Sequence, residues 1–570
     1  MKAHFYLLFF LLFLGSITSA QTVEWIGQFS SPSGVNIIDM SQDAQGNIYL
    51  CGTFGDSADF DPGPDVFELL GTSYVAKLDA NGDLVWAKSF NGFGVETVRP
   101  DNDGNVIIGF AFFQTIDFDP GPSVQNISPS GDTDILILKL DVDGNFVWAN
   151  QISGTSTASP NDLAIASDGS IVVTGNFRST PDFDPGPGTN TLTAFGGSDC
   201  YVLKLDNDGI FQWVRQFGGS AFEYGAKIAL DDTDQIYVLG EFFGTADFDP
   251  GAGTMDLSPQ GSSDMFFMKL SASGSVDFVT QFGSTVSQFP ETLRIEDDGF
   301  AYVSGGFSGS GDFDPGTGTF DMTALGDRDG FICKLMASSG DLVWARQFGA
   351  TQADVSTQSV AVTSDGTVFS TGSFSATPDF DPGADEFLIA GENLVDFDIF
   401  ISRLNQDGDF ECATGFVSLD TQLGLHLLST DSDELIMSGV FEGTVDFDPG
   451  PGVLELTNNG ESGILSNNGV DAFILQLGLD ACPPVSVFDP VFAEEIDLFP
   501  NPTSGQLRIE LNDTYADLTI RVIDVMGRIV DIQAFQFLDQ IDLDLNGASG
   551  MYFIELSTLE KRTILKVIKE

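Results

Sequence analysis

The chain has few basic side chains for its length. Lysine and arginine together number 22 against 84 aspartates and glutamates in 570 residues, a formal net charge of −62. Such a field repels nucleic acid and anionic lipid head groups and attracts cations and basic surfaces. The composition therefore excludes nucleic acid as a partner. Much of the charge is also accounted for by the solubility that an acidic surface gives an exported protein.

Histidine and cysteine are scarce as well. Beyond the first twenty residues only His426 remains, which leaves little for catalysis by a Ser/His or Cys/His pair. The five cysteines form no CxxC pair, so a zinc site or a disulfide framework is not indicated. Three lie in apolar, strand-like runs and are expected to be buried: Cys51, Cys200 and Cys333. A bridge between Cys412 and Cys482, which flank the end of a repeat array, is left open.

Long apolar runs are confined to the N-terminus. Lys2 precedes an apolar stretch over residues 5–14, and small residues follow as far as Ala20. This pattern is typical of a signal peptide, which we expect to span residues 1–20. No comparable run follows, so the sequence predicts no transmembrane span in the mature chain.

Internal repetition dominates the rest of the sequence. The pentapeptide DFDPG begins at residues 59, 117, 182, 247, 312, 379 and 446, at spacings of 58, 65, 65, 65, 67 and 67 residues. Each period contains four short runs rich in β-branched and aromatic residues, separated by Gly/Asp turns, with no helical periodicity. Four strands per radial unit is typical of a β-propeller blade, whereas a solenoid would stack its units without closing.

The two ends of the array favour closure. One position of the fourth run is occupied by Trp86, Trp148, Trp213, Phe278, Trp344 and Cys412 in the first six repeats, but the seventh repeat stops before its fourth run. The missing run matches VEWIGQF near the N-terminus, which places Trp25 at the same position. The sequence therefore predicts an all-β fold in which a seven-bladed β-propeller over residues 21–482 is closed by the N-terminal strand.

The repeats also resemble a known family. The segments GNIYLCGTF, DAFILQL and DGNFVWANQI are similar to the bacterial seven-bladed propeller repeat of the SBBP class. That resemblance implies the fold and an exported setting, and it implies no single activity.

The last part of the chain has a different composition. After a linker over residues 483–495, residues 496–570 alternate strand-like runs with turns and predict a small C-terminal β-sandwich. The motifs FPNP (499–502), DVMGR (524–528) and GMYFIEL (550–556), followed by a basic tail, resemble the type A C-terminal sorting domain of the type IX secretion system of Bacteroidetes. The resemblance implies that the type IX secretion machinery reads residues 496–570 and that the protein is secreted or held at the outer-membrane surface.

The DFDPG loops are the candidate metal site. Pro-Gly suits the centre of a type II turn, the second Asp can cap that turn, and the Phe is expected to pack against the blade. The first Asp has no evident role in the turn, so two carboxylates per loop are candidate ligands for calcium, the one cofactor considered. These residues are Asp59, Asp61, Asp117, Asp119, Asp182, Asp184, Asp247, Asp249, Asp312, Asp314, Asp379, Asp381, Asp446 and Asp448. The alternative is a capped turn with solvated acid.

Function is predicted from these parts together. A binding or adhesion module for a glycan or protein ligand, acting through the loops at the rim, is preferred to a structural surface-layer component. A hydrolase or lyase is the third alternative, because the repeats look nearly equivalent and arginine is scarce. No enzymatic activity is therefore predicted. Catalysis would be sought in the least regular segments, residues 391–400 and 458–471.

Overall fold

The fold is seen in a computed structural model. It describes residues 23–391, 396–430, 432–449, 453–459, 469–478, 487–488, 496–515, 518–524, 529–535, 538–545, 550–557 and 561–569. All regular elements in these ranges are β-strands. Within them, no helix has the length and apolarity needed to cross a membrane.

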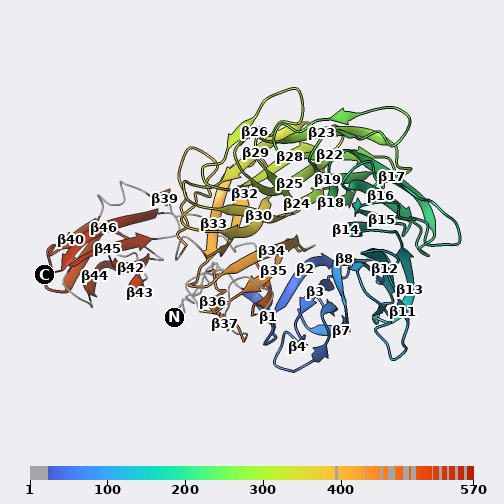
Figure 1. The fold of residues 1–570 in the computed structure, drawn as a ribbon. Helices are drawn as coiled ribbons and strands as arrows, with labels where there is room; N and C mark the ends of the chain where they lie inside the picture. The colour runs from blue at the N-terminus through green and yellow to red at the C-terminus, as the bar shows by residue number, and fades with distance from the viewer. Residues whose placement is uncertain are drawn as a thin grey trace, which may run out of the picture.

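Four-stranded antiparallel sheets follow one another along the chain (Figure 1). The first three sheets contain β2 (Val35–Gln42), β3 (Ile48–Phe54), β6 (Ser73–Leu78) and β7 (Leu84–Phe90); β8 (Phe93–Pro100), β9 (Val106–Phe112), β12 (Asp134–Leu140) and β13 (Phe146–Ile152); and β14 (Ala158–Ile165), β15 (Ile171–Phe177), β16 (Asp199–Leu205) and β17 (Phe211–Gly219). The next two contain β18 (Glu223–Leu230), β19 (Ile236–Phe242), β22 (Asp264–Leu270) and β23 (Val276–Ser284); and β24 (Gln288–Ile295), β25 (Phe300–Phe307), β28 (Asp329–Met336) and β29 (Leu342–Phe348). The last two contain β30 (Val355–Val362), β31 (Val368–Phe374), β32 (Asp398–Leu404) and β33 (Phe410–Phe416); and β34 (Gln422–Ser429), β35 (Leu435–Phe441), β38 (Asp471–Leu477) and β1 (Val23–Phe29).

Short strand pairs lie between the second and third strands of several sheets, at the DFDPG loops. They are β4 (Ser57–Asp59) with β5 (Glu68–Leu70), β10 (Ile116–Asp117) with β11 (Asn126–Ile127), β20 (Ala246–Asp247) with β21 (Asp256–Leu257), β26 (Ser310–Asp312) with β27 (Asp321–Thr323), and β36 (Thr444–Asp446) with β37 (Glu455–Thr457).

The middle strands of each sheet are apolar on both faces because neighbouring sheets pack against both. In β12 (DILILKL) and β38 (DAFILQL) every residue is buried. A strand covered on one face would instead alternate apolar and polar residues. The sheets therefore pack face to face, and the first strand of each contacts the first strand of the next: β2, β8, β14, β18, β24, β30 and β34. This radial arrangement of four-stranded sheets is a β-propeller.

The two ends of the array meet in one sheet. β1 pairs antiparallel with β38, with Gln28 opposite Phe473, and β34 contacts β2. Trp25 lies opposite Gln476, and its indole Nε1 donates a hydrogen bond of 2.6 Å to the Gln476 side-chain oxygen. In other sheets the equivalent pairs are Lys77 with Trp86 and Lys334 with Trp344. The predicted alignment of the N-terminal strand with the fourth strands is therefore confirmed.

The C-terminal strands form two further sheets with a core of their own. One contains β39 (Val487–Phe488), β46 (Lys561–Lys569), β45 (Gly550–Ser557), β42 (Leu518–Asp524) and β43 (Ile529–Phe535), and the other β40 (Ile496–Phe499), β41 (Gln506–Tyr515) and β44 (Leu538–Asp544). Ile509 and Ile541 of the smaller sheet share this core with Ile520 and Ile554 of the larger. The turn at residues 525–528, most of the linker and the signal peptide lie outside the described residues.

The cysteines divide as the sequence suggests. Cys51, Cys200 and Cys333 are free and buried, as predicted. Cys412 is disulfide-bonded. Cys482, the partner considered for it, lies outside the described residues.

Candidate functional site

The first Asp of each DFDPG loop organises the loop itself. In the copy at Asp247, Oδ1 accepts hydrogen bonds from the N–H of Asp249 at 2.9 Å and of Met255 at 2.8 Å. The other six copies repeat both bonds, at Asp59, Asp117, Asp182, Asp312, Asp379 and Asp446. The expectation that this residue is not needed by the turn was wrong. Its carboxylate accepts hydrogen bonds from both ends of the loop, from the N–H groups two and eight residues further along the chain.

The turn type also differs from the expectation. Oδ1 of Asp249 accepts the N–H of Gly251 at 2.7 Å, and the same bond recurs at Asp61, Asp119, Asp184, Asp314 and Asp381. None of the six glycines concerned adopts the positive φ that a type II turn requires. The side chain of the second Asp closes an Asx turn instead, in which glycine needs no left-handed conformation.

The loops also connect neighbouring sheets. Asp247 pairs with Gly218 at the end of β17, which belongs to the preceding sheet, and Asp312 pairs in the same way with Gly283 at the end of β23. Isolated bridges repeat this contact at Asp59, Asp182 and Asp379. Five of the seven loops therefore connect their own sheet to the sheet before it.

The Phe of the loop packs as predicted. Six of the seven are fully buried: Phe60, Phe183, Phe248, Phe313, Phe380 and Phe447. Phe248 contacts Phe217 of the preceding sheet and Phe242 and Phe266 of its own. The Asp/Gly hairpins between the third and fourth strands are likewise confirmed; Asp79, for example, accepts the N–H groups of Asn81 and Asp83.

A calcium site at these loops stays a prediction. No three His, Cys, Asp or Glu side chains converge as metal ligands within the part of the chain that the structure describes. One loop therefore offers two carboxylates whose Oδ1 atoms already accept backbone N–H groups, and the remaining ligands would have to be carbonyl oxygens or water.

A second candidate site, missed in the sequence, lies where the first strands meet. We call it the axial cavity: about 660 Å³, lined by side chains of β2, β8, β14, β18, β24, β30 and β34. In each first strand the pairing register shifts by one residue, and the residue after this bulge occupies an equivalent place. These residues are Asp39, Thr97, Asp162, Lys227, Thr292, Ser359 and His426. The position is repeated, but its chemistry is not.

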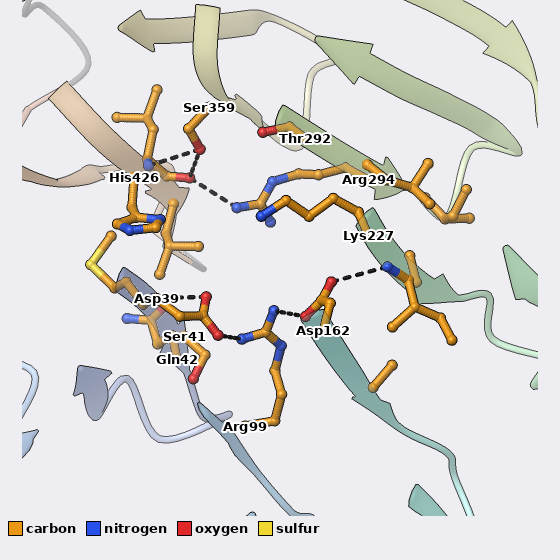
Figure 2. A pocket seen from close by; sticks show the side chains of 18 of the residues that line it. Asp39, Ser41, Gln42, Arg99, Asp162, Lys227, Thr292, Arg294, Ser359 and His426 are labelled. Carbon is orange, nitrogen blue, oxygen red and sulfur yellow. Dashed lines mark hydrogen bonds and ion pairs between the residues drawn. The ribbon is translucent and has the colours of Figure 1, made fainter. Parts of the chain in front are cut away.

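Arg99 lies between two carboxylates on one side of the axial cavity. Its guanidinium bridges Asp39 of β2 and Asp162 of β14, with 2.7 Å between Nη2 and Asp162 Oδ1 (Figure 2). Asp39 also accepts the N–H groups of Met40 and Val98. Burial raises the pKa of Asp39, but Arg99 and the Val98 N–H outweigh it and hold that pKa below its ordinary value. These three side chains are therefore a hydrogen-bonded structural cluster with one net negative charge.

Arg294 and Lys227 extend into the cavity from β24 and β18 (Figure 2). Arg294 Nε donates to the carbonyl of Val360 at 2.5 Å, and Nη2 donates to that of Leu427 at 2.8 Å. Among the described residues, Arg294 Nη1 and Lys227 Nζ have no hydrogen-bond acceptor and no ion-pair partner. The cavity therefore presents two cationic side chains, Lys227 with its whole ammonium group unpaired and Arg294 with only Nη1 unpaired among the described residues.

His426 lines the cavity from β34. Its Nε2 is buried and makes no hydrogen bond in the structure. Burial lowers the pKa of His426 to about 4, although Asp39 opposes the shift, so the imidazole is neutral at pH 7. Two glutamates of one strand region line the cavity as well, Glu291 at the β24 bulge and Glu296 just after β24. Burial raises the pKa of both.

Comparison with known proteins identifies one part of the chain. Residues 497–570 match the family model of the secretion system C-terminal sorting domain. The match confirms the predicted sorting domain, and it implies handling by the secretion machinery and export to the cell surface or the medium.

Two curated proteins match parts of the chain. An uncharacterized WD repeat-containing protein of Acanthamoeba polyphaga mimivirus is 25% identical over 261 residues, which is 38% of this chain and 18% of that protein. The regulatory protein FlaEY of Caulobacter vibrioides is 26% identical over 247 residues, 39% of this chain and 25% of that protein. The chain therefore matches a quarter or less of the length of these relatives.

Solved structures with a similar arrangement include two enzymes. A quinohemoprotein alcohol dehydrogenase from Comamonas testosteroni has a TM-score of 0.39 at 10% identity, covering 79% of this chain and 76% of its own. Virginiamycin B lyase from Staphylococcus aureus has a TM-score of 0.38 at 8% identity, covering 79% and 98%. Scores this low assign neither an activity nor a substrate.

Proposed function

We propose that the chain is an exported binding module: a seven-bladed β-propeller closed by β1, with a ligand site in the axial cavity. The domain limits follow the sequence, with a signal peptide over residues 1–20, the propeller over 21–482, a linker over 483–495 and the sorting domain over 496–570. The pairing of β1 with β38 and the contact of β34 with β2 support a closed ring. Closure leaves neither the first nor the last sheet with an uncovered face.

One observation supports the binding role: the residue types differ from repeat to repeat where the first strands meet. Residues 21–482 contain fourteen lysines and arginines. Six occupy one repeated third-strand position, namely Lys77, Lys139, Lys204, Lys269, Lys334 and Arg403. By contrast Arg99, Lys227 and Arg294 lie in first strands and line the axial cavity. A cavity of a few hundred Å³ with a few convergent polar groups is typical of a small-molecule site.

Export supports the same role. A sorting domain places the propeller outside the cell or at its surface, where capture of a soluble ligand or a chain end is a useful activity. Binding through the loops at the rim is the alternative for a glycan or protein ligand, and a structural surface component is the next. A hydrolase or lyase would need the bound ligand to be turned over.

A glycan array with the mature propeller separates these roles. Binding by the wild type should be lost in Ala229→Phe, because Ala229 lines the cavity and the larger side chain fills it. The matched rim variant Phe195→Ala removes a side chain that is 66% exposed and should bind normally. Loss of binding only in the rim variant, or no binding to any glycan, would contradict the axial site. Mass spectrometry of the recovered ligand shows whether it has been cleaved.

A further inference from the structure

We infer that the axial cavity takes a small sugar acid, with its carboxylate held between Lys227 and Arg294. This inference rests on the proposed axial site and names the chemistry of its ligand. Among the described residues, Lys227 Nζ, Arg294 Nη1 and His426 Nε2 make no hydrogen bond, and the carboxylates of Glu291 and Glu296 line the same cavity. A ligand that satisfies all of these groups must be both acidic and hydroxylated.

Local charge favours an anion at this depth. In the two inward-facing residues that follow each bulge, the charged side chains are Arg99, Lys227, Arg294, Asp39 and Asp162. Because His426 is neutral, these groups sum to one positive charge in a molecule whose net charge is −62. Lys227 and Arg294 therefore form a local positive spot in a strongly negative protein, and a ligand carboxylate would pair with them. Glu291 and Glu296 line the cavity as well, and when both are ionised they bring the whole lining to one negative charge.

The two cations differ in how they are held. Arg294 is fixed by its bonds to the carbonyls of Val360 and Leu427, which leave Nη1 facing the cavity (Figure 2). Lys227 is a mobile point charge on a long stem and can adjust to the second carboxylate oxygen. A fixed donor and an adjustable one together orient one planar carboxylate.

The remaining lining selects hydroxyl groups. The buried Nε2 of His426 is neutral and can exchange one hydrogen bond with a hydroxyl, which can both donate and accept. Glu291 and Glu296 line the cavity and can only accept when ionised. A second carboxylate near either glutamate would be repelled, so a hydroxylated monoacid fits better than a diacid.

The test compares D-glucuronate with D-glucose, which differ in the carboxylate at one carbon. Saturation-transfer difference NMR on the mature full chain should show binding of glucuronate at least ten-fold tighter than glucose. Lys227→Gln and Arg294→Gln should each weaken glucuronate binding about ten-fold or more. Lys204→Gln, a lysine outside the cavity lining, should leave it unchanged.

The outcomes separate this inference from the proposed site. Glucose binding that Ala229→Phe abolishes, without preference for glucuronate, would overturn the sugar-acid inference and keep the axial site. No binding of either probe overturns the inference as well. Glucuronate binding that persists in Ala229→Phe overturns both, because the ligand would then occupy another surface. Circular dichroism and unfolding curves of each variant exclude loss of the fold as the cause.

Discussion

The DFDPG loops and the axial cavity lie in the same repeats and obey opposite rules. In the loops, seven copies keep the same residues: the first Asp accepts two N–H groups in every copy, and the Phe is fully buried in six of the seven. At the axial cavity, the equivalent positions after the bulges vary among Asp, Thr, Lys, Ser and His, and six of the seven line the cavity. What is repeated builds the fold, and what is not repeated is available for recognition. Substitutions in the two regions should therefore separate stability from binding.

The loop Phe should give the largest loss of stability. Phe248→Ala removes a fully buried ring that contacts two sheets, so we expect the free energy of unfolding to fall by about 3–5 kcal/mol. Urea unfolding followed by intrinsic fluorescence measures the change. Phe195→Ala, at a Phe that is 66% exposed, is the matched control and should shift the midpoint little. A loss below about 1 kcal/mol for Phe248→Ala would show that the loops do not hold the sheets together.

Glu223 extends the comparison between repeated and non-repeated positions. It is not repeated in the other sheets, but it lies at an interface between sheets and not in the cavity. It is buried at the start of β18, where β24 and β34 begin with Gln288 and Gln422 and the other four first strands begin with Val35, Phe93, Ala158 and Val355. Burial raises its pKa to about 7, with a further contribution from the Asp199 carboxylate. Between about pH 4.5 and 7 the folded chain thus binds a proton that the unfolded chain releases, so wild-type stability falls as pH rises.

Glu223→Gln removes that pH dependence. The variant should gain about 2 kcal/mol over the wild type between pH 4.5 and 8, because the amide keeps an acceptor for the Gly219 N–H and carries no charge. Thermal unfolding at a series of pH values measures the gain. Glu68→Gln, at an exposed glutamate, should show no such trend. A constant difference across this range would mean that Glu223 does not change ionisation on folding.

The first Asp of the loop should have a moderate effect. Asp247→Ala leaves the N–H groups of Asp249 and Met255 without their acceptor, which should cost about 1–2 kcal/mol in denaturant unfolding. Asp256→Ala, at an exposed carboxylate of the same loop, is the control. Equal losses in the two variants would contradict the role assigned to Asp247.

The calcium prediction needs a substitution that keeps the turn. Asp247→Asn retains an oxygen for both N–H groups and removes the charge, so its stability in EDTA should be close to that of the wild type. If calcium binds, adding Ca²⁺ should raise the wild-type Tm, and the rise should shrink in Asp247→Asn but not in Asp256→Asn. If added Ca²⁺ leaves the wild-type Tm unchanged, calcium binding at these loops is excluded.

The contrast between repeated and non-repeated positions also decides which features could be predicted from the sequence alone. The strands, the fourth-strand position of Trp25 and the sorting domain could be predicted because each repeats a pattern or matches a motif. The role of the first Asp was missed because its second partner, the N–H eight residues on, is visible only once the loop folds back. The segments expected to be most irregular, residues 391–400 and 458–471, lie partly outside the described residues, and the axial cavity draws on all seven first strands instead.

A signal for the axial cavity was nevertheless present. Its seven residues each precede the first Asp of their DFDPG loop by twenty positions, as Lys227 precedes Asp247. Strand alternation alone does not show which side of a first strand faces the axis, and the bulge reverses that side in mid-strand. Aligned repeats would have exposed a fixed position with variable chemistry, but its place on the axis comes only from the packing of the sheets.

The smallest effect on stability is expected where the effect on binding is largest. In the described residues Lys227 Nζ makes neither a hydrogen bond nor an ion pair, so Lys227→Gln should change the free energy of unfolding by no more than about 0.5 kcal/mol. Arg99→Gln, in the same cavity, should have the opposite effect on stability. It leaves Asp39 and Asp162 without their shared cation and should lower the free energy of unfolding by several kcal/mol. Urea unfolding of both variants beside the wild type tests the contrast. A large loss in Lys227→Gln would mean that this lysine stabilises the packing of the sheets through the carboxylates around it, and its charge would then serve the fold instead of a ligand.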